Sequence, residues 1–186
     1  NYTARLIELL RQGEIDCAIV ALPIPDAGLM IEPLYDEPFV VAVPSHHPWA
    51  TRKRIASDEL KDETMLLLGT GHCFRDQVLE VCPELARFSP SSEGIQRSFE
   101  GSSLETIRHM VAAGLGVTVM PVSSITSTGP EDELLRYIPF EEPVPDRRVV
   151  LAWRRSFPRP AAIEALAHGV RHCGLPNVHI LDKVSA

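Results

Sequence analysis

Short, nearly continuous apolar runs that alternate with amphipathic stretches constrain the fold of this chain most. The apolar runs lie at residues 15–22, 39–43, 64–68, 116–121 and 147–155, and helical periodicity lies at 6–10, 74–81, 104–114 and 161–173. Runs of this length are typical of strands buried on both faces, and their alternation with helices is typical of parallel sheets covered by helices. We therefore predict an α/β fold.

The predicted strands are too many for one small sheet, and two extended crossings lie near residues 34–40 and 134–140. We expect two lobes joined by these crossings, with a cleft between them. Residues 1–36 and 140–186 would form the first lobe, and residues 37–139 the second. Pro33 and Pro38 are expected to interrupt the extended stretch from Leu29 to Val43. We also expect a short strand at 97–100 and a helix cap that pairs Ser102 with Glu105.

Composition and charge narrow the class of protein. Of 186 residues, 45% are hydrophobic and 23% charged, which is ordinary for a soluble globular protein. A net charge of −7 argues against this fragment gripping a phosphate backbone by itself, because such binding needs a basic face. No apolar run approaches the roughly 18–20 residues of a membrane span, and no signal segment opens the chain. We expect a cytoplasmic location and no contact with a membrane.

Two of the four cysteines, Cys73 and Cys82, lie nine residues apart in one predicted helix. Nine helical residues advance the axis by about 13.5 Å and turn the second side chain away from the first. A disulfide needs Cα atoms about 4.4–6.8 Å apart. The two thiols therefore never pair, or their pairing remodels the protein. The second case describes a redox switch.

The surroundings of Cys73 suit a reactive thiolate. The residue falls in the first turn of the predicted helix, where negative charge is favoured, and His72 and Arg75 are close in sequence. Gln77, four residues on, shares its helical face and could donate a hydrogen bond. Such a thiolate can attack peroxide to give a sulfenic acid, which Cys82 would convert into a disulfide. The residues alone leave open that both are buried bystander thiols.

The remaining cysteines and the histidine pair carry weaker signals. Cys17 lies in a predicted strand and Cys173 at the end of a predicted helix, and we expect both to be bystanders. His46 and His47 have no cysteine or acidic residue at ligand spacing, so we expect a solvated loop there. We expect no metal and no cofactor.

The block Gly71-His72-Cys73-Phe74-Arg75-Asp76-Gln77, with Cys82 nine residues after Cys73, resembles the peroxide-sensing segment found among the LysR-type transcriptional regulators. Further blocks agree across most of the chain, and the cysteine spacing is the most specific of the matching features. These blocks are at residues 36–38, 47–50, 103–108, 110–116, 146–148 and 153–154.

The resemblance implies a regulatory domain of two Rossmann-like lobes, similar to periplasmic binding proteins. It assigns Cys73 as the peroxidatic and Cys82 as the resolving cysteine. By the same resemblance, Thr3 matches a threonine that holds peroxide, His72 and Arg148 match residues that support the thiolate, and Gln77 matches a pocket glutamine. The predicted helix from Leu104 to Ala113 is a candidate subunit interface.

The same family layout also indicates which elements this chain lacks and which partners it binds. By this layout we expect the chain to lack the DNA-reading winged helix-turn-helix and the first strand and helix of lobe I with another pocket threonine, and we expect the segment 83–96 to differ in length. The expected partners are hydrogen peroxide, a cellular disulfide reductant and further copies in a homodimer or homotetramer. DNA and RNA polymerase would be reached only through the full-length protein.

Two other functions remain open. One is a LysR-type domain that binds a small organic inducer between its lobes, with incidental cysteines. The other is a Cys–His thiol peroxidase, for which no Asp or Asn is clearly placed to orient His72. We expect the chain not to be an enzyme. A zinc site made of His72, Cys73 and Cys82 is a further possibility, but two cysteines nine residues apart on one helix cannot close a tetrahedron.

Overall fold

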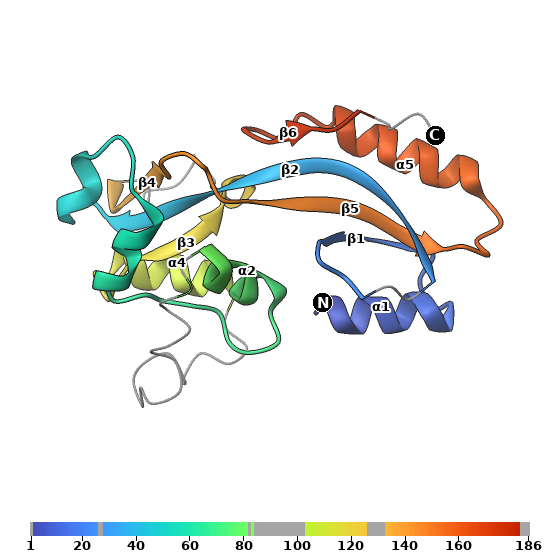
Figure 1. Cartoon of the computed structure of the whole chain (residues 1–186), viewed down its shortest axis with the longest axis horizontal. Helices are drawn as coiled ribbons and strands as arrows, with labels where there is room; N and C mark the ends of the chain where they lie inside the picture. The colour runs from blue at the N-terminus through green and yellow to red at the C-terminus, as the bar shows by residue number, and fades with distance from the viewer. Residues whose placement is uncertain (1, 26–27, 82, 84–102, 126–132, 183–186) are drawn as a thin grey trace. The chain divides into compact units, whose positions relative to one another are not determined.

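The computed structural model describes residues 2–25, 28–81, 83, 103–125 and 133–182 (Figure 1). The chain divides into two compact units. Unit 1 consists of residues 1–37 and 146–186, and unit 2 of residues 38–145. Strands and helices alternate along both, so the predicted α/β fold is confirmed.

Unit 1 is a sheet with a helix on each face. Its elements are α1 (Thr3–Gln12), β1 (Cys17–Ala21), the first part of β2 (Leu29–Pro44), β5 (Asp146–Arg154), α5 (Pro160–His172) and β6 (His179–Ile180). Successive residues of β5 point to opposite faces, as strand geometry requires. Val150 and Ala152 pack against Ile7 and Leu10 of α1, whereas Leu151 packs against Ile163 and Ala167 of α5. This alternation separates the two cores.

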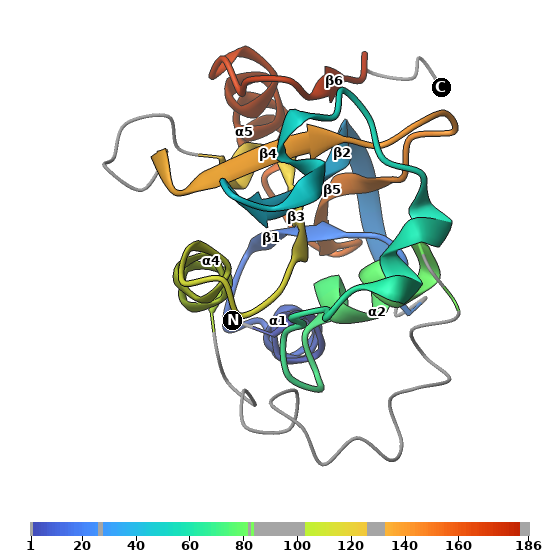
Figure 2. The same ribbon diagram turned by 90° about the vertical axis from the view of Figure 1, so that its left-hand side faces the viewer.

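Unit 2 is a sheet covered by helices. It contains the rest of β2, the 3-10 helices η1 (Pro48–Thr51) and η2 (Ser57–Asp62), α2 (Cys73–Val81), α4 (Leu104–Ala112), β3 (Thr118–Pro121), η4 (Val122–Ser124) and β4 (Leu135–Pro139). Strand β2 pairs with β3 on one side and β4 on the other. Figures 1 and 2 both place α2 and α4 on the same side of this sheet. Their apolar faces share one core with Phe39, Val41 and Val43 of β2.

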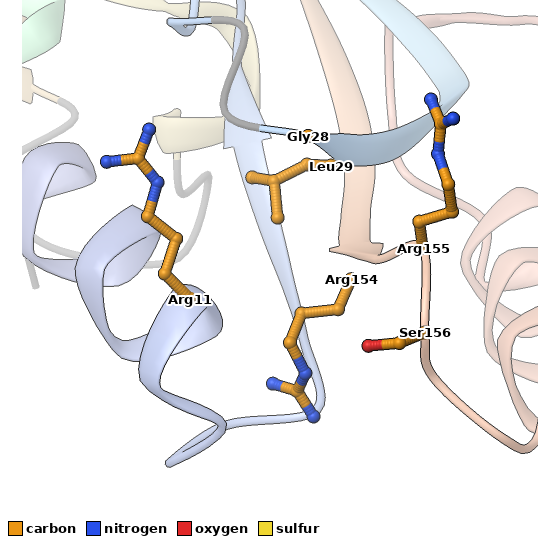
Figure 3. A pocket seen from close by; sticks show the side chains of 6 residues that line it. All are labelled: Arg11, Gly28, Leu29, Arg154, Arg155 and Ser156. Atoms are coloured by element: carbon orange, nitrogen blue, oxygen red, sulfur yellow. The ribbon is translucent and has the colours of Figure 1, made fainter.

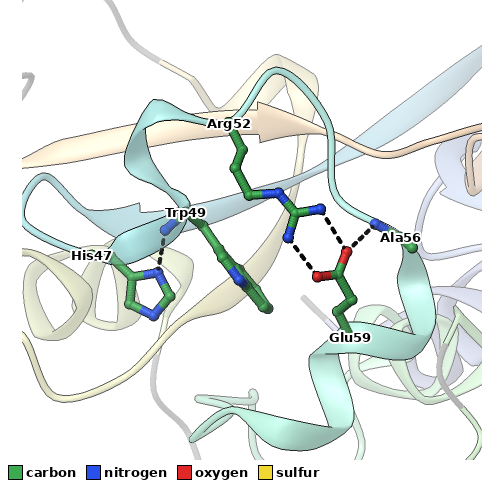
Figure 4. Close-up of polar contacts among 5 residues, drawn as sticks. All are labelled: His47, Trp49, Arg52, Ala56 and Glu59. Carbon is green, nitrogen blue, oxygen red and sulfur yellow. Dashed lines mark hydrogen bonds and ion pairs between the residues drawn. The ribbon is translucent and has the colours of Figure 1, made fainter.

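The segment after β2 is fixed by polar contacts to the backbone. The Nδ1 atom of His47 accepts a hydrogen bond of 3.2 Å from the amide of Trp49 and so caps η1. The carboxylate of Glu59 accepts hydrogen bonds from the amide of Ala56, at 3.0 Å, and from the guanidinium of Arg52 (Figure 4). His47 is therefore a capping residue of an ordered turn, where the sequence predicted a solvated loop.

The prediction of parallel sheets was wrong for the paired strands. The pairings β1–β5, β2–β3, β2–β4 and β2–β6 are all antiparallel. In the described residues, parallel pairing occurs at two isolated bridges, Ile55–Phe140 and Met65–Val117. The predicted strand at 64–68 is thus a buried extended segment with a single bridge. A continuous apolar run shows burial on both faces, but it carries no information on the direction of its neighbour.

Two local predictions were also wrong. Strand β2 runs for 16 residues without a break at Pro33 or Pro38, because a strand tolerates proline where its nitrogen needs no ladder partner. The N-cap of α4 is Ser103, whose hydroxyl accepts a hydrogen bond of 3.2 Å from the amide of Thr106. Ser102 and the strand predicted at 97–100 lie outside the described residues.

Candidate redox site

A buried segment and a glycine turn bring Cys73 to the start of α2. Met65 to Leu68 are all at most 5% exposed, and Thr70 and Gly71 form the turn that follows. Gly71 has a φ of +93°, which lies in the region that favours glycine. The chain therefore leaves the core and turns directly into the helix that begins at Cys73.

The first turns of α2 are anchored to the core of unit 2. Phe74 and Val78 are 6% and 2% exposed, and the ring of Phe74 meets that of Phe39 edge to face at 5.3 Å. Nη1 of Arg75 donates a hydrogen bond of 3.0 Å to the carbonyl of Leu68. A helix of nine residues is marginal by itself, so these contacts hold it in place.

Three of the predicted site residues belong to this one segment. Cys73 and His72 are half-buried, and Gln77, one turn after Cys73, is 6% exposed. The thiol thus lies at the positive end of a helix, with an imidazole and an amide from the same segment. The other cysteine of the pair, Cys82, follows the last residue of α2 and lies outside the described residues.

The other two predicted site residues belong to unit 1. Thr3 is the first residue of α1, and Arg148 lies on β5. Nε and Nη2 of Arg148 donate hydrogen bonds of 2.7 and 2.8 Å to the two carboxylate oxygens of Asp36. The bidentate contact lowers the pKa of Asp36 and raises that of Arg148. In this structure Arg148 therefore has a carboxylate partner.

The sequence reading missed a buried ion pair beside that contact. Glu37 is fully buried, and Arg147 brings Nε to 2.7 Å and Nη2 to 2.6 Å from its Oε2 atom. The sequence contains two adjacent acidic residues, Asp36 and Glu37, and two adjacent arginines, Arg147 and Arg148, which could have suggested two ion pairs. Only the approach of β2 and β5 shows that they pair.

The remaining thiols differ from Cys73 in setting. Cys17 is half-buried on β1, and burial, aided by Asp16, raises the pKa of its thiol. Cys173 is exposed at the end of α5, where its thiol lies 3.0 Å from the carbonyl of Val170. Across the described ranges, no three His, Cys, Asp or Glu side chains are grouped so that they could hold a metal ion. No helix in that part of the chain is long and apolar enough to cross a membrane.

A family model for the LysR substrate binding domain matches residues 1–172. This chain belongs to that family. The LysR domain is 37% identical over 169 residues to a hydrogen peroxide-inducible genes activator of Pectobacterium carotovorum subsp. carotovorum, covering 91% of this chain and 54% of the relative. It is 35% identical over 169 residues to the DNA-binding transcriptional dual regulator OxyR of Escherichia coli (strain K12), covering 91% and 53%. The chain thus spans about half the length of these relatives.

The structure of a reduced form of OxyR from N. meningitidis superimposes on this LysR domain with a TM-score of 0.90. The two are 43% identical, and the match covers 98% of this chain and 83% of the other. The family and the periplasmic-binding-protein-like fold that were predicted from the cysteine segment and the flanking blocks are therefore confirmed.

Proposed function

We propose that this chain is the hydrogen-peroxide-sensing regulatory domain of a LysR-type transcriptional regulator. The Cys73 thiolate attacks one peroxide oxygen, the O–O bond breaks, and the other oxygen leaves as water after protonation. The Cys82 thiolate then attacks the sulfenic sulfur and releases a second water. Hydrogen peroxide is reduced, the two thiols are oxidised to a disulfide, and a cellular thiol reductant resets the switch.

The observation that carries this proposal is the position of Cys73 at the first residue of α2. The helix extends to Val81, eight residues further, which places the Cα atoms of Cys73 and Val81 about 12 Å apart. One Cα–Cα step of about 3.8 Å cannot bring a residue bonded to Val81 within the ~6.8 Å limit of a disulfide. A Cys73–Cys82 bond therefore requires α2 to unwind, so oxidation and conformation are coupled.

The anchoring contacts indicate what such unwinding would change. Phe74 and Val78 are buried in the core of unit 2, so a disulfide that breaks α2 must move at least part of this apolar surface. We infer that the disulfide replaces core packing with a covalent constraint and so creates two discrete states. The altered surface of unit 2 would pass the change to further subunits. Helix α4 is our candidate contact within the homodimer or homotetramer.

We assign the pocket residues as follows. His72 would support the thiolate of Cys73, and Gln77 would belong to its pocket, both from the segment of Cys73. Thr3 would hydrogen-bond the peroxide, and Arg148 would stabilise the thiolate.

The wider activity belongs to the full-length protein. Of two relatives about twice this length, one is named a hydrogen peroxide-inducible genes activator and the other a DNA-binding transcriptional dual regulator. With a net charge of −7, this chain is a poor binder of DNA by itself. We therefore propose that DNA and RNA polymerase are contacted only through the full-length regulator in the cytoplasm. We further propose that peroxide acts on it once per switch, without enzymatic turnover.

The test is oxidation of the reduced chain with about one equivalent of hydrogen peroxide, followed by disulfide mapping by mass spectrometry. We expect a Cys73–Cys82 bond and a loss of helix by far-ultraviolet circular dichroism. Cys73→Ser should block the bond, whereas Cys82→Ser should trap a sulfenic acid on Cys73. A chain with both Cys17→Ser and Cys173→Ser is the control and should form the same bond.

Two results would contradict the proposal. One is the absence of the Cys73–Cys82 bond, or its replacement by bonds that still form in Cys73→Ser. The other is sustained peroxide consumption with a thiol reductant at many turnovers per chain, which would indicate a thiol peroxidase instead of a switch.

A further inference from the structure

An open pocket of about 390 Å³ lies entirely within unit 1. It is lined by the end of α1, the start of β2 and the turn that follows β5, through Arg11, Gly28, Leu29, Arg154, Arg155 and Ser156 (Figure 3). This volume falls within the roughly 300–1,000 Å³ of sites that hold small molecules. Three arginines in one pocket of a chain with net charge −7 make it locally positive.

One of these arginines has a structural role. Nη1 of Arg154 donates hydrogen bonds of 2.7 Å to the carbonyls of Leu10 and Ile15, and Nη2 lies 3.9 Å from the carboxylate of Asp16. These bonds tie the end of α1 to β5. Arg154 thus supports the pocket wall, and its guanidinium is already committed to the protein.

The other two arginines are available to a ligand. In the part of the chain that the structure describes, the side chains of Arg11 and Arg155 form no ion pair and no hydrogen bond, and both are exposed. By contrast, most of the arginines that the structure describes lie beside a carboxylate, as Arg52 does beside Glu59 and Arg171 beside Glu32. Arg11 and Arg155 thus line the same pocket without a carboxylate partner among the described residues. A negatively charged ligand would form ion pairs with them there.

The arrangement of these side chains indicates the shape of the ligand. In Figure 3, Arg11 and Arg155 stand on opposite sides of the pocket, with Leu29 between them. Guanidinium groups bind carboxylates in a bidentate manner, and an apolar side chain suits a short methylene body. Ser156 adds a hydroxyl beside Arg155.

We propose that this pocket binds a small dicarboxylate, with one carboxylate on Arg11, the other on Arg155 and its aliphatic part on Leu29. The pocket includes none of the residues assigned to the cysteine chemistry. It would therefore give the domain an input separate from peroxide.

The experiment is calorimetric titration of the reduced chain with succinate, with propionate as the monocarboxylate comparison and sodium chloride at matched ionic strength. We expect succinate to bind at least about tenfold more tightly than propionate, and chloride to give no saturable heat. Arg11→Gln and Arg155→Gln should each weaken succinate binding about tenfold or more, because each removes one charged hydrogen-bonding partner. Arg159→Gln is the matched control, since Arg159 is exposed and close in sequence to Ser156 but does not line the pocket.

Equal binding of succinate and propionate would overturn the proposal. So would unchanged affinity in Arg11→Gln and Arg155→Gln, or an equal loss in Arg159→Gln, which would indicate a general charge effect. Cys73→Ser should retain succinate binding in full. This variant separates the proposal from the redox function, because either can fail while the other holds.

Discussion

Removal of Arg147 should destabilise the protein far more than removal of its neighbour Arg148. Arg147 contacts Glu37, which is fully buried, and the Arg147 side chain itself is only 19% exposed. Arg148 binds Asp36, but its own side chain is 49% exposed. Loss of one partner of a buried pair costs about 3–5 kcal/mol, because the other charge stays buried and loses that ion pair. A solvent-exposed pair contributes about 0–1 kcal/mol.

The measurement is urea unfolding of Arg147→Gln and Arg148→Gln, followed by circular dichroism. Both variants lose one positive charge and keep a side chain of similar length, so they are matched in chemistry and adjacent in sequence. We expect a loss of about 3–5 kcal/mol in the free energy of unfolding for Arg147→Gln and at most about 1 kcal/mol for Arg148→Gln. The double variant Glu37→Gln with Arg147→Gln should recover part of the loss, because it removes the buried charge.

Equal losses in the two single variants would refute this reasoning, since it rests on the difference in burial between the two pairs. The reasoning would also be refuted if the double variant lost as much free energy of unfolding as the sum of the losses in Arg147→Gln and Glu37→Gln. In that case the two side chains would act independently, and the contact between them would carry no coupling energy.

Three further predictions concern stability. Because Arg148 lowers the folded-state pKa of Asp36, their contact stabilises the protein above the ordinary aspartate pKa of 3.8. This stabilisation is lost as the pH falls through the folded-state pKa of Asp36. The difference in melting temperature between the unchanged protein and Asp36→Asn should therefore disappear in acid. Phe74→Ala should cost about 3–5 kcal/mol in urea unfolding, whereas exposed Asp76→Ala should stay within about 0.5 kcal/mol. Ser103→Ala should cost about 1 kcal/mol through loss of the α4 cap, and Ser103→Gly only a few tenths; equal costs would contradict the cap assignment.

Periodicity predicted which segments form secondary structure better than how they pair. The helices at 3–12, 104–112 and 160–172 and the strand at 146–154 follow from local patterns of apolar residues. Strand direction is a property of two segments that meet in space, so the antiparallel pairing of β1 with β5 could not be read from either one. The continuity of β2 through Pro38 likewise depends on which backbone nitrogens face a partner.

The candidate site was predictable where it is local. Cys73 and Gln77 belong to α2 and His72 directly precedes it, so spacing alone placed the three together. The contacts Glu37–Arg147 and Asp36–Arg148 join residues more than a hundred positions apart, and only the approach of β2 and β5 brings them together. The same holds for the pocket of Arg11 and Arg155, which no motif marks.

The interrupted path of the chain through unit 1 has a consequence for synthesis. Unit 2 is one continuous stretch of the chain, residues 38–145. In unit 1, β1 cannot pair until β5 has been synthesised, since Cys17 pairs with Trp153. On a ribosome, the core around Phe74 can form as soon as its own residues have emerged. Unit 1 closes only when the last quarter of the chain is available, because its pairing joins distant segments. The cysteine helix would therefore be seated on its core while the rest of the protein is still being made.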